Sequence, residues 1–497
     1  MRASGILMPV FSLPSRYGIG SFSKSAYQFV DMLKKAGQKY WQILPLCPTS
    51  YGDSPYQSFS TYAGNPYFID LDQLIEEKLL TRKECQACDF GDDPQDIDYG
   101  KLYENRFKLL RKAYERANVG EDQEFEAYRR ENAWWLDDYA LFMAVKDRFD
   151  GVAWNEWAED IRLRWSNAMD YYRRELYYEI EFYSYLQFVF MKQWKKLKNY
   201  ANINGIEIIG DIPIYVAFDS ADAWANPELF QFDAENLPTA VAGCPPDGFS
   251  ADGQLWGNPL YRWDYHRETG FDWWIRRIAY CSELYDVVRI DHFRGFDEYY
   301  SIPYGDTTAR NGHWEKGPGI ALFEAAKNRL GELNIIAEDL GYITDSVKKL
   351  VADSGFPGMK VLEFAFDSRE KSDYLPYTYE KNSVVYTGTH DNETIAGWYA
   401  GLDKSDLKMC TDYMNIDRIP GKENHWDFIR LAMLSVSDLC VIPIQDYLGL
   451  DNRARINHPS TLGTNWRWRL AKGQLSASLL KEIREMTRIS GRLQNGE

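Results

Sequence analysis

Cysteine is scarce in this chain of 497 residues, which holds seven scattered copies, an odd number. Scarcity of this kind argues against a disulfide framework and for a reducing compartment. Cys85 and Cys88 form a lone C-x-x-C pair, and no second pair or histidine cluster follows at zinc-binding spacing. We therefore interpret these two residues as ordinary thiols.

Long apolar runs are missing as well. No stretch approaches the roughly 20 apolar residues that are needed to span a bilayer. The apolar run at residues 5–10 is too short for a secretion signal and contains Pro9. We expect a soluble, cytoplasmic protein without a membrane partner, and the sequence indicates no particular oligomeric state.

Positive charge is in deficit, with 57 Lys and Arg against 74 Asp and Glu, which gives a net charge of −17. Such a field repels phosphate backbones, so nucleic acid is excluded as a partner, whereas a neutral sugar is not opposed. Aromatic residues are abundant (17 Trp, 35 Tyr and 25 Phe), and flat rings stack on the apolar faces of sugars. Core packing remains the commoner use of such residues.

Eight short, continuous apolar runs predict strands that are buried on both faces of a parallel sheet. These runs cover residues 6–10, 40–46, 206–214, 287–290, 335–337, 359–366, 384–386 and 441–444. Helical patterns separate them, at residues 24–36, 183–200, 320–330, 344–354 and 428–439, with Thr344 as a candidate N-cap. Eight strand–helix units predict an α/β protein with a (β/α)8 TIM barrel. A doubly wound open sheet is the alternative, but no G-x-G-x-x-G pattern supports it.

A minimal barrel takes about 250 residues, so roughly half of this chain must be inserted between barrel strands. We expect a mainly helical insertion at 49–184, an active-site loop region at 217–286 and a helical segment at 397–440. There is no Gly/Ser-rich linker and no repeat of fixed period. We therefore interpret residues 1–497 as a single catalytic barrel with insertions.

Carboxylates follow four of the predicted strands: Asp211, Asp291, Glu338 and Asp391. In a barrel of this kind the carboxyl ends of the strands share one face, so these side chains should converge there. Carboxylates at such places also cap helices or form structural ion pairs, and that alternative is open for each one alone. Asp339, which should face away from Glu338, is interpreted as structural.

Cleavage of a glycosidic bond needs one ionised and one protonated carboxyl group. Arg289 lies two residues before Asp291, so both side chains leave a strand on the same side, and the guanidinium should keep Asp291 anionic. Glu338 has no basic neighbour in sequence and lies in a mainly apolar stretch, so burial should raise its pKa. Asp391, beside His390, is placed to grip sugar hydroxyls, and His292 is a candidate contact to substrate or to Asp291.

Three segments resemble the signature regions of the α-amylase superfamily: 288–296 (VRIDHFRGF), 337–341 (AEDLG) and 389–392 (THDN). Five more narrow the resemblance to the 4-α-glucanotransferases of glycoside hydrolase family 77, the amylomaltases or disproportionating enzymes. These are 51–57 (YGDSPYQ), 210–216 (GDIPIYV), 243–250 (GCPPDGFS), 254–259 (QLWGNP) and 465–469 (NWRWR). The resemblance runs from about Gly5 to Leu470.

The resemblance implies transfer of 1,4-α-glucan segments to the 4-hydroxyl of glucose or of another glucan, by a retaining double displacement. Asp291 is then the nucleophile, Glu338 the acid and base, and Asp391 the stabiliser of the transition state. The donors implied are malto-oligosaccharides, amylose and other 1,4-α-glucans, with glucose as acceptor. The implied substrate contacts are Ser54, Tyr56, Asp211, Asp247, Trp256, Arg289, His292 and His390.

Asp211 is followed by Ile-Pro-Ile-Tyr-Val, whereas the amylases proper place an Asn-His pair nearby. This difference argues against a calcium site of the amylase type, and we expect neither metal nor cofactor. The three acids alone do not separate a transferase from an amylase-like hydrolase, but the presence of all three argues against the third alternative, a non-catalytic glucan-binding barrel. The loop at 245–256, with Asp247, Phe249 and Trp256 toward substrate and Gly248, Gly253 and Gly257 as hinges, is our candidate for a lid that excludes water.

Overall fold

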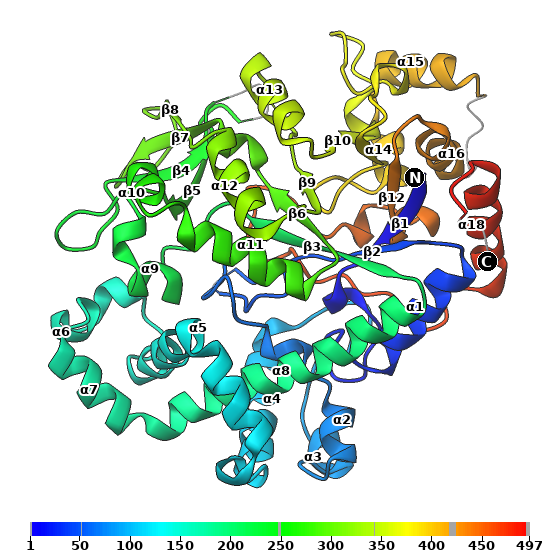
Figure 1. The fold of residues 1–497 in the computed structure, drawn as a ribbon. Helices are drawn as coiled ribbons and strands as arrows, with labels where there is room; N and C mark the ends of the chain where they lie inside the picture. Colours follow the sequence, from blue (N-terminus) through cyan, green and yellow to red (C-terminus); the bar gives the residue numbers. More distant parts are fainter. Residues whose placement is uncertain (1, 51, 247–249, 342, 417–423, 494–497) are drawn as a thin grey trace.

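The computed structural model describes residues 2–50, 52–246, 250–341, 343–416 and 424–493, and its centre is a sheet of eight parallel strands (Figure 1). The order in the sheet is β10-β11-β12-β1-β2-β3-β6-β9. In chain order the strands are β1 (Ala3–Leu7), β2 (Tyr40–Gln42), β3 (Glu207–Pro213), β6 (Val287–Asp291), β9 (Ile335–Ala337), β10 (Gly358–Val361), β11 (Ser383–Tyr386) and β12 (Leu439–Pro443).

The two ends of this order, β9 and β10, meet and bring the sheet close to a full barrel. The Ala337 N–H donates to the Pro357 carbonyl at 2.9 Å, and the Met359 N–H donates to Asp339 Oδ1 at 2.7 Å. The (β/α)8 barrel is therefore confirmed, and the open doubly wound sheet is wrong. Asp339 thus connects β9 to β10 where the barrel closes, and its interpretation as a structural residue is confirmed.

Each of the eight predicted runs overlaps a barrel strand, because residues buried on both faces leave a continuous apolar signal. The bounds differ at some ends. The first strand starts at Ala3, three residues before the run predicted for it, and β10 stops at Val361, where a short 3-10 helix (Leu362–Phe364) begins.

The predicted helices are also present: α1 (Lys24–Lys35), α8 (Tyr177–Ile203), α12 (Ile320–Leu330), α13 (Asp345–Ser354) and α16 (His425–Leu434). Thr344 caps α13 by accepting a hydrogen bond from the Val347 N–H, as predicted. Helix α16 lies a few residues earlier than expected, because it ends at Leu434 and residues 435–438 lead into β12. Among the helices that the structure describes, none is long and apolar enough to cross a bilayer.

Helices dominate the stretch between β2 and β3, which lies to one side of the barrel in Figure 1. Those preceding α8 are α2 (Leu71–Glu76), α3 (Arg82–Gln86), α4 (Tyr99–Arg116), α5 (Gln123–Arg148), α6 (Glu159–Arg162) and α7 (Ser166–Glu175). The remaining helices are α9 (Ala221–Ala225), α10 (Trp263–Glu268), α11 (Asp272–Leu284), α14 (Ile395–Gly401), α15 (Lys404–Met414), α17 (Ile444–Tyr447) and α18 (Ala477–Ile489). The division into one catalytic barrel and three insertions stays a prediction.

A second, antiparallel sheet of four strands was not predicted from the sequence. It consists of β4 (Ala240–Cys244), β5 (Gln254–Pro259), β7 (Glu298–Pro303) and β8 (His313–Lys316), in the order β5-β4-β7-β8. It packs on a small core of Val241, Tyr300, Ile302 and Ala309. The sheet extends beyond the loop region expected at 217–286, and it places β5, which carries Trp256, beside the carboxyl end of β6.

Candidate functional site

Three of the four carboxylates predicted to converge belong to the neighbouring strands β3, β6 and β9, and the fourth follows β11. Asp211 is on β3 and pairs in register with Arg289 on β6, while Asp291 ends β6. Glu338 directly follows β9, the next strand of the barrel, and its N–H donates to the Ile290 carbonyl of β6. Asp391 follows β11, and its charge contributes to the pKa of Asp291.

The guanidinium of Arg289 is shared between two of these carboxylates. Its Nη1 donates to both oxygens of Asp211 at 2.7 Å and to Asp291 Oδ1 at 3.2 Å. The sequence argument assigned Arg289 to Asp291 alone, and this is corrected by the cross-strand register. Burial raises the pKa of Asp291 to about 6, which Arg289 moderates and the negative charge of Asp211 reinforces.

Glu338 is buried at the end of β9, with 8% of its surface exposed. Burial, followed by the charge of Asp291, raises the pKa of Glu338 to about 7. Two main-chain N–H groups donate to its carboxylate, His292 N–H to Oε2 at 2.6 Å and Leu340 N–H to Oε1 at 2.8 Å. His292 reaches this geometry with a φ of 54°, in the left-handed region that a side chain rarely adopts. The group can thus hold a proton near neutral pH and is still stabilised when it ionises.

Asp391 is held from two sides. The Asn457 Nδ2 donates to Asp391 Oδ1 at 2.6 Å, and His390 Nε2 lies 3.3 Å from Oδ2. Desolvation raises the pKa of Asp391, but the charge and hydrogen bond of His390, together with Asn457, outweigh it and lower the pKa to about 2. Burial opposes protonation of His390, yet Asp391 raises the pKa of the ring above its ordinary value. Each of the two side chains therefore favours the charged form of the other.

Tyr56 lies between these groups. Its hydroxyl donates to Asp211 Oδ2 at 2.8 Å, and its ring stacks on His390 with centroids 5.1 Å apart and planes inclined by 11°. Ser54 accepts a hydrogen bond from the Tyr56 N–H at 3.2 Å, so its side chain shapes the turn that presents Tyr56. The stacking of Tyr56 under a sugar stays a prediction.

Trp256 stands edge-on to His292, with ring centroids 4.8 Å apart and planes at 90°. Burial, and then the charge of Arg294, lowers the pKa of His292 to about 3, which leaves its ring neutral near pH 7. Strand β5 is tied to the segment at residues 50–57 by Gln57, whose Nε2 donates to Asn258 Oδ1 at 3.0 Å. Trp256, at the end of the candidate lid, therefore lies beside the residue that follows Asp291, and the lid itself stays a prediction.

Some of the predicted residues fall outside the description. Asp247, Gly248 and Phe249 lie outside the described residues, so their predicted places at the lid stay predictions. The two other candidate hinges, Gly253 and Gly257, have positive φ values of 69° and 77°, which suits glycine.

Three residues near the site were missed by the sequence reasoning. Arg455 and Asn457 contact Asp391 but fall in no quoted segment, and nothing in their spacing pointed to the site. Trp466 lies 5.8 Å from Tyr56 and 6.0 Å from His390 between ring centroids. Trp466 does belong to the 465–469 segment that carries the family resemblance, so that segment was the available signal.

Within the part of the chain that the structure describes, no group of three or more His, Cys, Asp or Glu side chains is arranged to hold a metal ion. The side chains gathered at the strand ends are carboxylates, the guanidinium of Arg289, imidazole rings and aromatic rings. The expectation that no cofactor is required stays a prediction.

A (β/α)8 barrel that places a buried, protonatable glutamate beside an aspartate at its strand ends has the layout of an enzyme that cleaves glycosidic bonds. The family model described as 4-alpha-glucanotransferase, glycoside hydrolase family 77, matches residues 8–475. The chain belongs to this family.

Two curated relatives are similar in sequence to this chain over nearly the whole length of both proteins. A 4-alpha-glucanotransferase of Clostridium butyricum is 49% identical, covering 98% of this chain and 100% of the relative. A 4-alpha-glucanotransferase of Streptococcus pneumoniae serotype 4 is also 49% identical, covering 99% of this chain and 98% of the relative. Among solved structures, the amylomaltase from Streptococcus agalactiae in complex with acarbose is 44% identical, with a TM-score of 0.96, covering 99% of this chain and 100% of that one.

Proposed function

We propose that this protein is a 4-α-glucanotransferase that moves segments of 1,4-α-glucan from a donor to the 4-hydroxyl of glucose or of another 1,4-α-glucan. The single observation that carries the mechanism is the placement of two carboxyl groups on adjacent barrel strands. Asp291 ends β6, and the buried Glu338 follows the neighbouring strand β9, where two main-chain N–H groups donate to its carboxylate. Family membership supplies the substrate class, and malto-oligosaccharides and amylose are the donors proposed. The full-length agreement with relatives named for this activity supports the proposal.

In the first half-reaction, the ionised carboxylate of Asp291 attacks the anomeric carbon while Glu338 donates its proton to the leaving oxygen. The glucosidic bond breaks, an ester forms between Asp291 and the donor segment, and the shortened glucan leaves. Burial of Glu338 suits this role because it keeps the acid protonated near neutral pH. Retaining enzymes hold such carboxyl groups about 5–5.5 Å apart, and we propose that separation here.

In the second half-reaction, Glu338 takes the proton of the acceptor 4-hydroxyl, whose oxygen attacks the anomeric carbon and releases Asp291. After the first step Glu338 is left as a carboxylate, and the main-chain N–H groups of His292 and Leu340 stabilise this ionised form. The number of glucosidic bonds is the same before and after this cycle. Asp391 and His390 are proposed to grip the hydroxyls of the distorted sugar.

Transfer requires that a sugar hydroxyl, and not water, reaches the ester on Asp291. Trp256 packs against His292 beside Asp291 and Glu338, and β5 is bonded to the Tyr56 segment through Gln57 and Asn258. This cover supports the proposal that strand β5 and the adjoining lid exclude water from the ester. We also propose a cytoplasmic location, because the structure shows no disulfide bond among the described cysteines, which suits a reducing compartment.

Incubation with maltotriose separates the three interpretations of the site. We expect free glucose together with a ladder of oligosaccharides longer than maltotriose, while the total number of reducing ends stays constant. Shortening without any ladder would identify a hydrolase, and an unchanged substrate would identify a glucan-binding barrel. The Asp291→Asn variant, purified in the same way, is the matched control that excludes a contaminating enzyme.

A further inference from the structure

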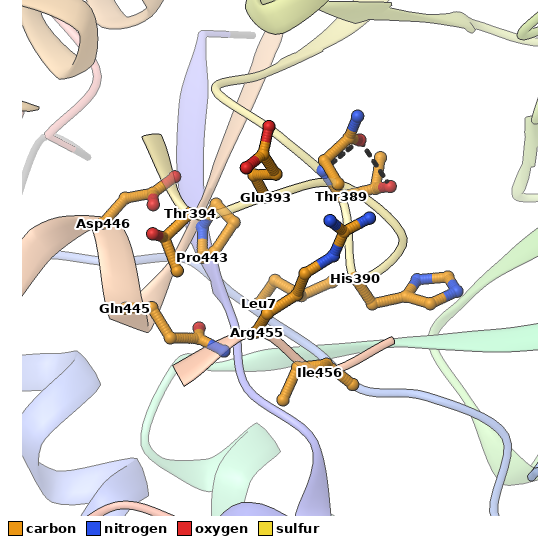
Figure 2. A pocket seen from close by; sticks show the side chains of 11 residues that line it. Leu7, Thr389, His390, Glu393, Thr394, Pro443, Gln445, Asp446, Arg455 and Ile456 are labelled. Carbon is orange, nitrogen blue, oxygen red and sulfur yellow. Dashed lines mark hydrogen bonds between the residues drawn. The ribbon is translucent and has the colours of Figure 1, made fainter. Parts of the chain in front are cut away.

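The segment at residues 452–457 packs against the loop that carries Asp391 and forms hydrogen bonds with it. Arg455 uses two edges of its guanidinium, with Nη2 donating to the Asp391 carbonyl and Nε donating to the Asn457 carbonyl, both at 2.7 Å. The Asn457 N–H donates to the His390 carbonyl at 3.1 Å, and its side chain donates to Asp391 Oδ1. Figure 2 shows the Arg455 side chain extending toward the loop with Thr389 and His390.

This segment is itself anchored to the barrel. Ile456 is buried, and the Gln445 Nε2 next to β12 donates to the Ala454 carbonyl at 3.2 Å. At the far end of the loop, Asn452 Oδ1 accepts from the Thr394 N–H at 3.2 Å. The loop after β11 is therefore held at both ends by a stretch of chain that lies more than 50 residues further on.

The hydrogen bonds within the loop fix its shape but do not fix its position relative to the other carboxylates. The Asp391 N–H donates to Thr389 Oγ1 at 3.2 Å, and the Thr389 N–H donates to Asn392 Oδ1 at 2.9 Å. Both bonds shape the turn locally and would persist if the whole loop moved. The Arg455 bridge is different from these local bonds, because, together with the contacts of Asn457, it joins the loop at Asp391 to a segment fixed on the barrel.

We propose that Arg455 is a positioning residue that sets the place of the Asp391 carboxylate, through the Asp391 carbonyl and through Asn457. The planar fork of arginine suits this role, because it presents N–H groups toward two carbonyls at once, which an ammonium group does not do in a fixed geometry. The inference rests on the proposed function, in which Asp391 acts on the sugar at the cleavage point. A displacement of about 1 Å at such a group lowers turnover strongly while leaving the fold intact.

The test compares Arg455→Met and Arg455→Lys with a matched control, Arg453→Met. Arg453 is two residues away, its side chain is 92% exposed and its ion-pair partner is Asp451 on the same turn. With maltotriose as substrate, we expect kcat of Arg455→Met to fall by about tenfold or more, with KM changed by less than about threefold, since a positioning effect acts on the transition state. Arg455→Lys should recover only part of kcat, and Arg453→Met should behave as wild type.

Two further readouts separate positioning from folding. The thermal midpoint of Arg455→Met should stay close to that of Arg453→Met, and added guanidinium chloride at millimolar concentration should restore part of kcat in Arg455→Met only. Wild-type kcat in Arg455→Met overturns the inference, and so does a lost kcat that follows a lost thermal midpoint without recovery by guanidinium. A wild-type protein without transfer activity overturns the proposed function itself, and an active Asp391→Asn variant overturns the role of Asp391.

Discussion

Arg289 and Asp211 form a buried ion pair in which Nη1 lies 2.7 Å from both carboxylate oxygens, with side chains that are 3% and 0% exposed. The more distant contact of the same nitrogen, 3.2 Å, goes to Asp291. The positive charge that stabilises the proposed nucleophile is therefore divided with Asp211. Burial raises the pKa of Asp291 although an arginine lies beside it, and the negative charge of Asp211 offsets part of the effect of Arg289.

Asp211→Asn should destabilise the protein and make Asp291 more acidic. Loss of one partner of a buried ion pair costs about 3 kcal/mol of unfolding free energy. With the charge of Asp211 gone, Arg289 acts on Asp291 alone, so the pKa of Asp291 should fall. Urea unfolding measures the first effect and the acid limb of kcat/KM the second.

The control for this variant is Asp353→Asn, which removes an exposed partner of Lys349 on α13. Exposed pairs contribute little to stability, so this change should leave the urea midpoint nearly unchanged. Equal effects of the two substitutions would contradict the central place given to the Arg289–Asp211 pair.

The pH dependence of kcat/KM follows from the two raised pKa values. Below about pH 6 Asp291 takes up a proton and loses its nucleophilic form, and above about pH 7 Glu338 loses the proton that the leaving oxygen needs. We expect a narrow bell whose maximum lies between these values. A rate that stays flat up to pH 9 would show that Glu338 is not the acid.

Trp256→Ala should shift the enzyme from transfer toward hydrolysis, because the indole covers His292 at the side of the site nearest the lid. Trp256→Phe, which keeps a ring in this place, should retain most of the transfer. Hydrolysis creates one new reducing end per cleavage and transfer creates none, so a reducing-end assay beside a glucose assay measures the ratio. An unchanged ratio in Trp256→Ala would remove the tryptophan from the proposed lid.

The barrel could be predicted from the sequence because burial on both faces leaves uninterrupted apolar runs. The predicted bounds of β9, 335–337, agree with the structure at both ends. The antiparallel sheet could not be predicted in the same way. Strand β5 is half-exposed and contains Gly257 and Pro259, which are poor strand formers, so its pattern resembles a loop. What holds β5 as a strand is its antiparallel pairing with β4, a contact that its own sequence does not reveal.

In the site, too, features set by the local sequence could be predicted, whereas contacts between residues far apart in the chain could not. The placement of Asp291, Glu338 and Asp391 after strands could be predicted, since parallel strands end on one face. The pairing of Arg289 with Asp211 depends on a register between strands 78 residues apart, which no local pattern encodes. The bond from Asn457 to Asp391 spans 66 residues and was missed for the same reason.

The most direct measurement is a search for the covalent ester on Asp291. In the Glu338→Gln variant, an α-maltosyl fluoride donor can still react, because its leaving group needs no proton, while the ester lacks the base that discharges it. Mass spectrometry of the intact protein and of its peptides should then find one maltosyl unit on the peptide that contains Asp291. An adduct on another residue, or products with the inverted anomeric configuration and no adduct, would contradict the double displacement through Asp291.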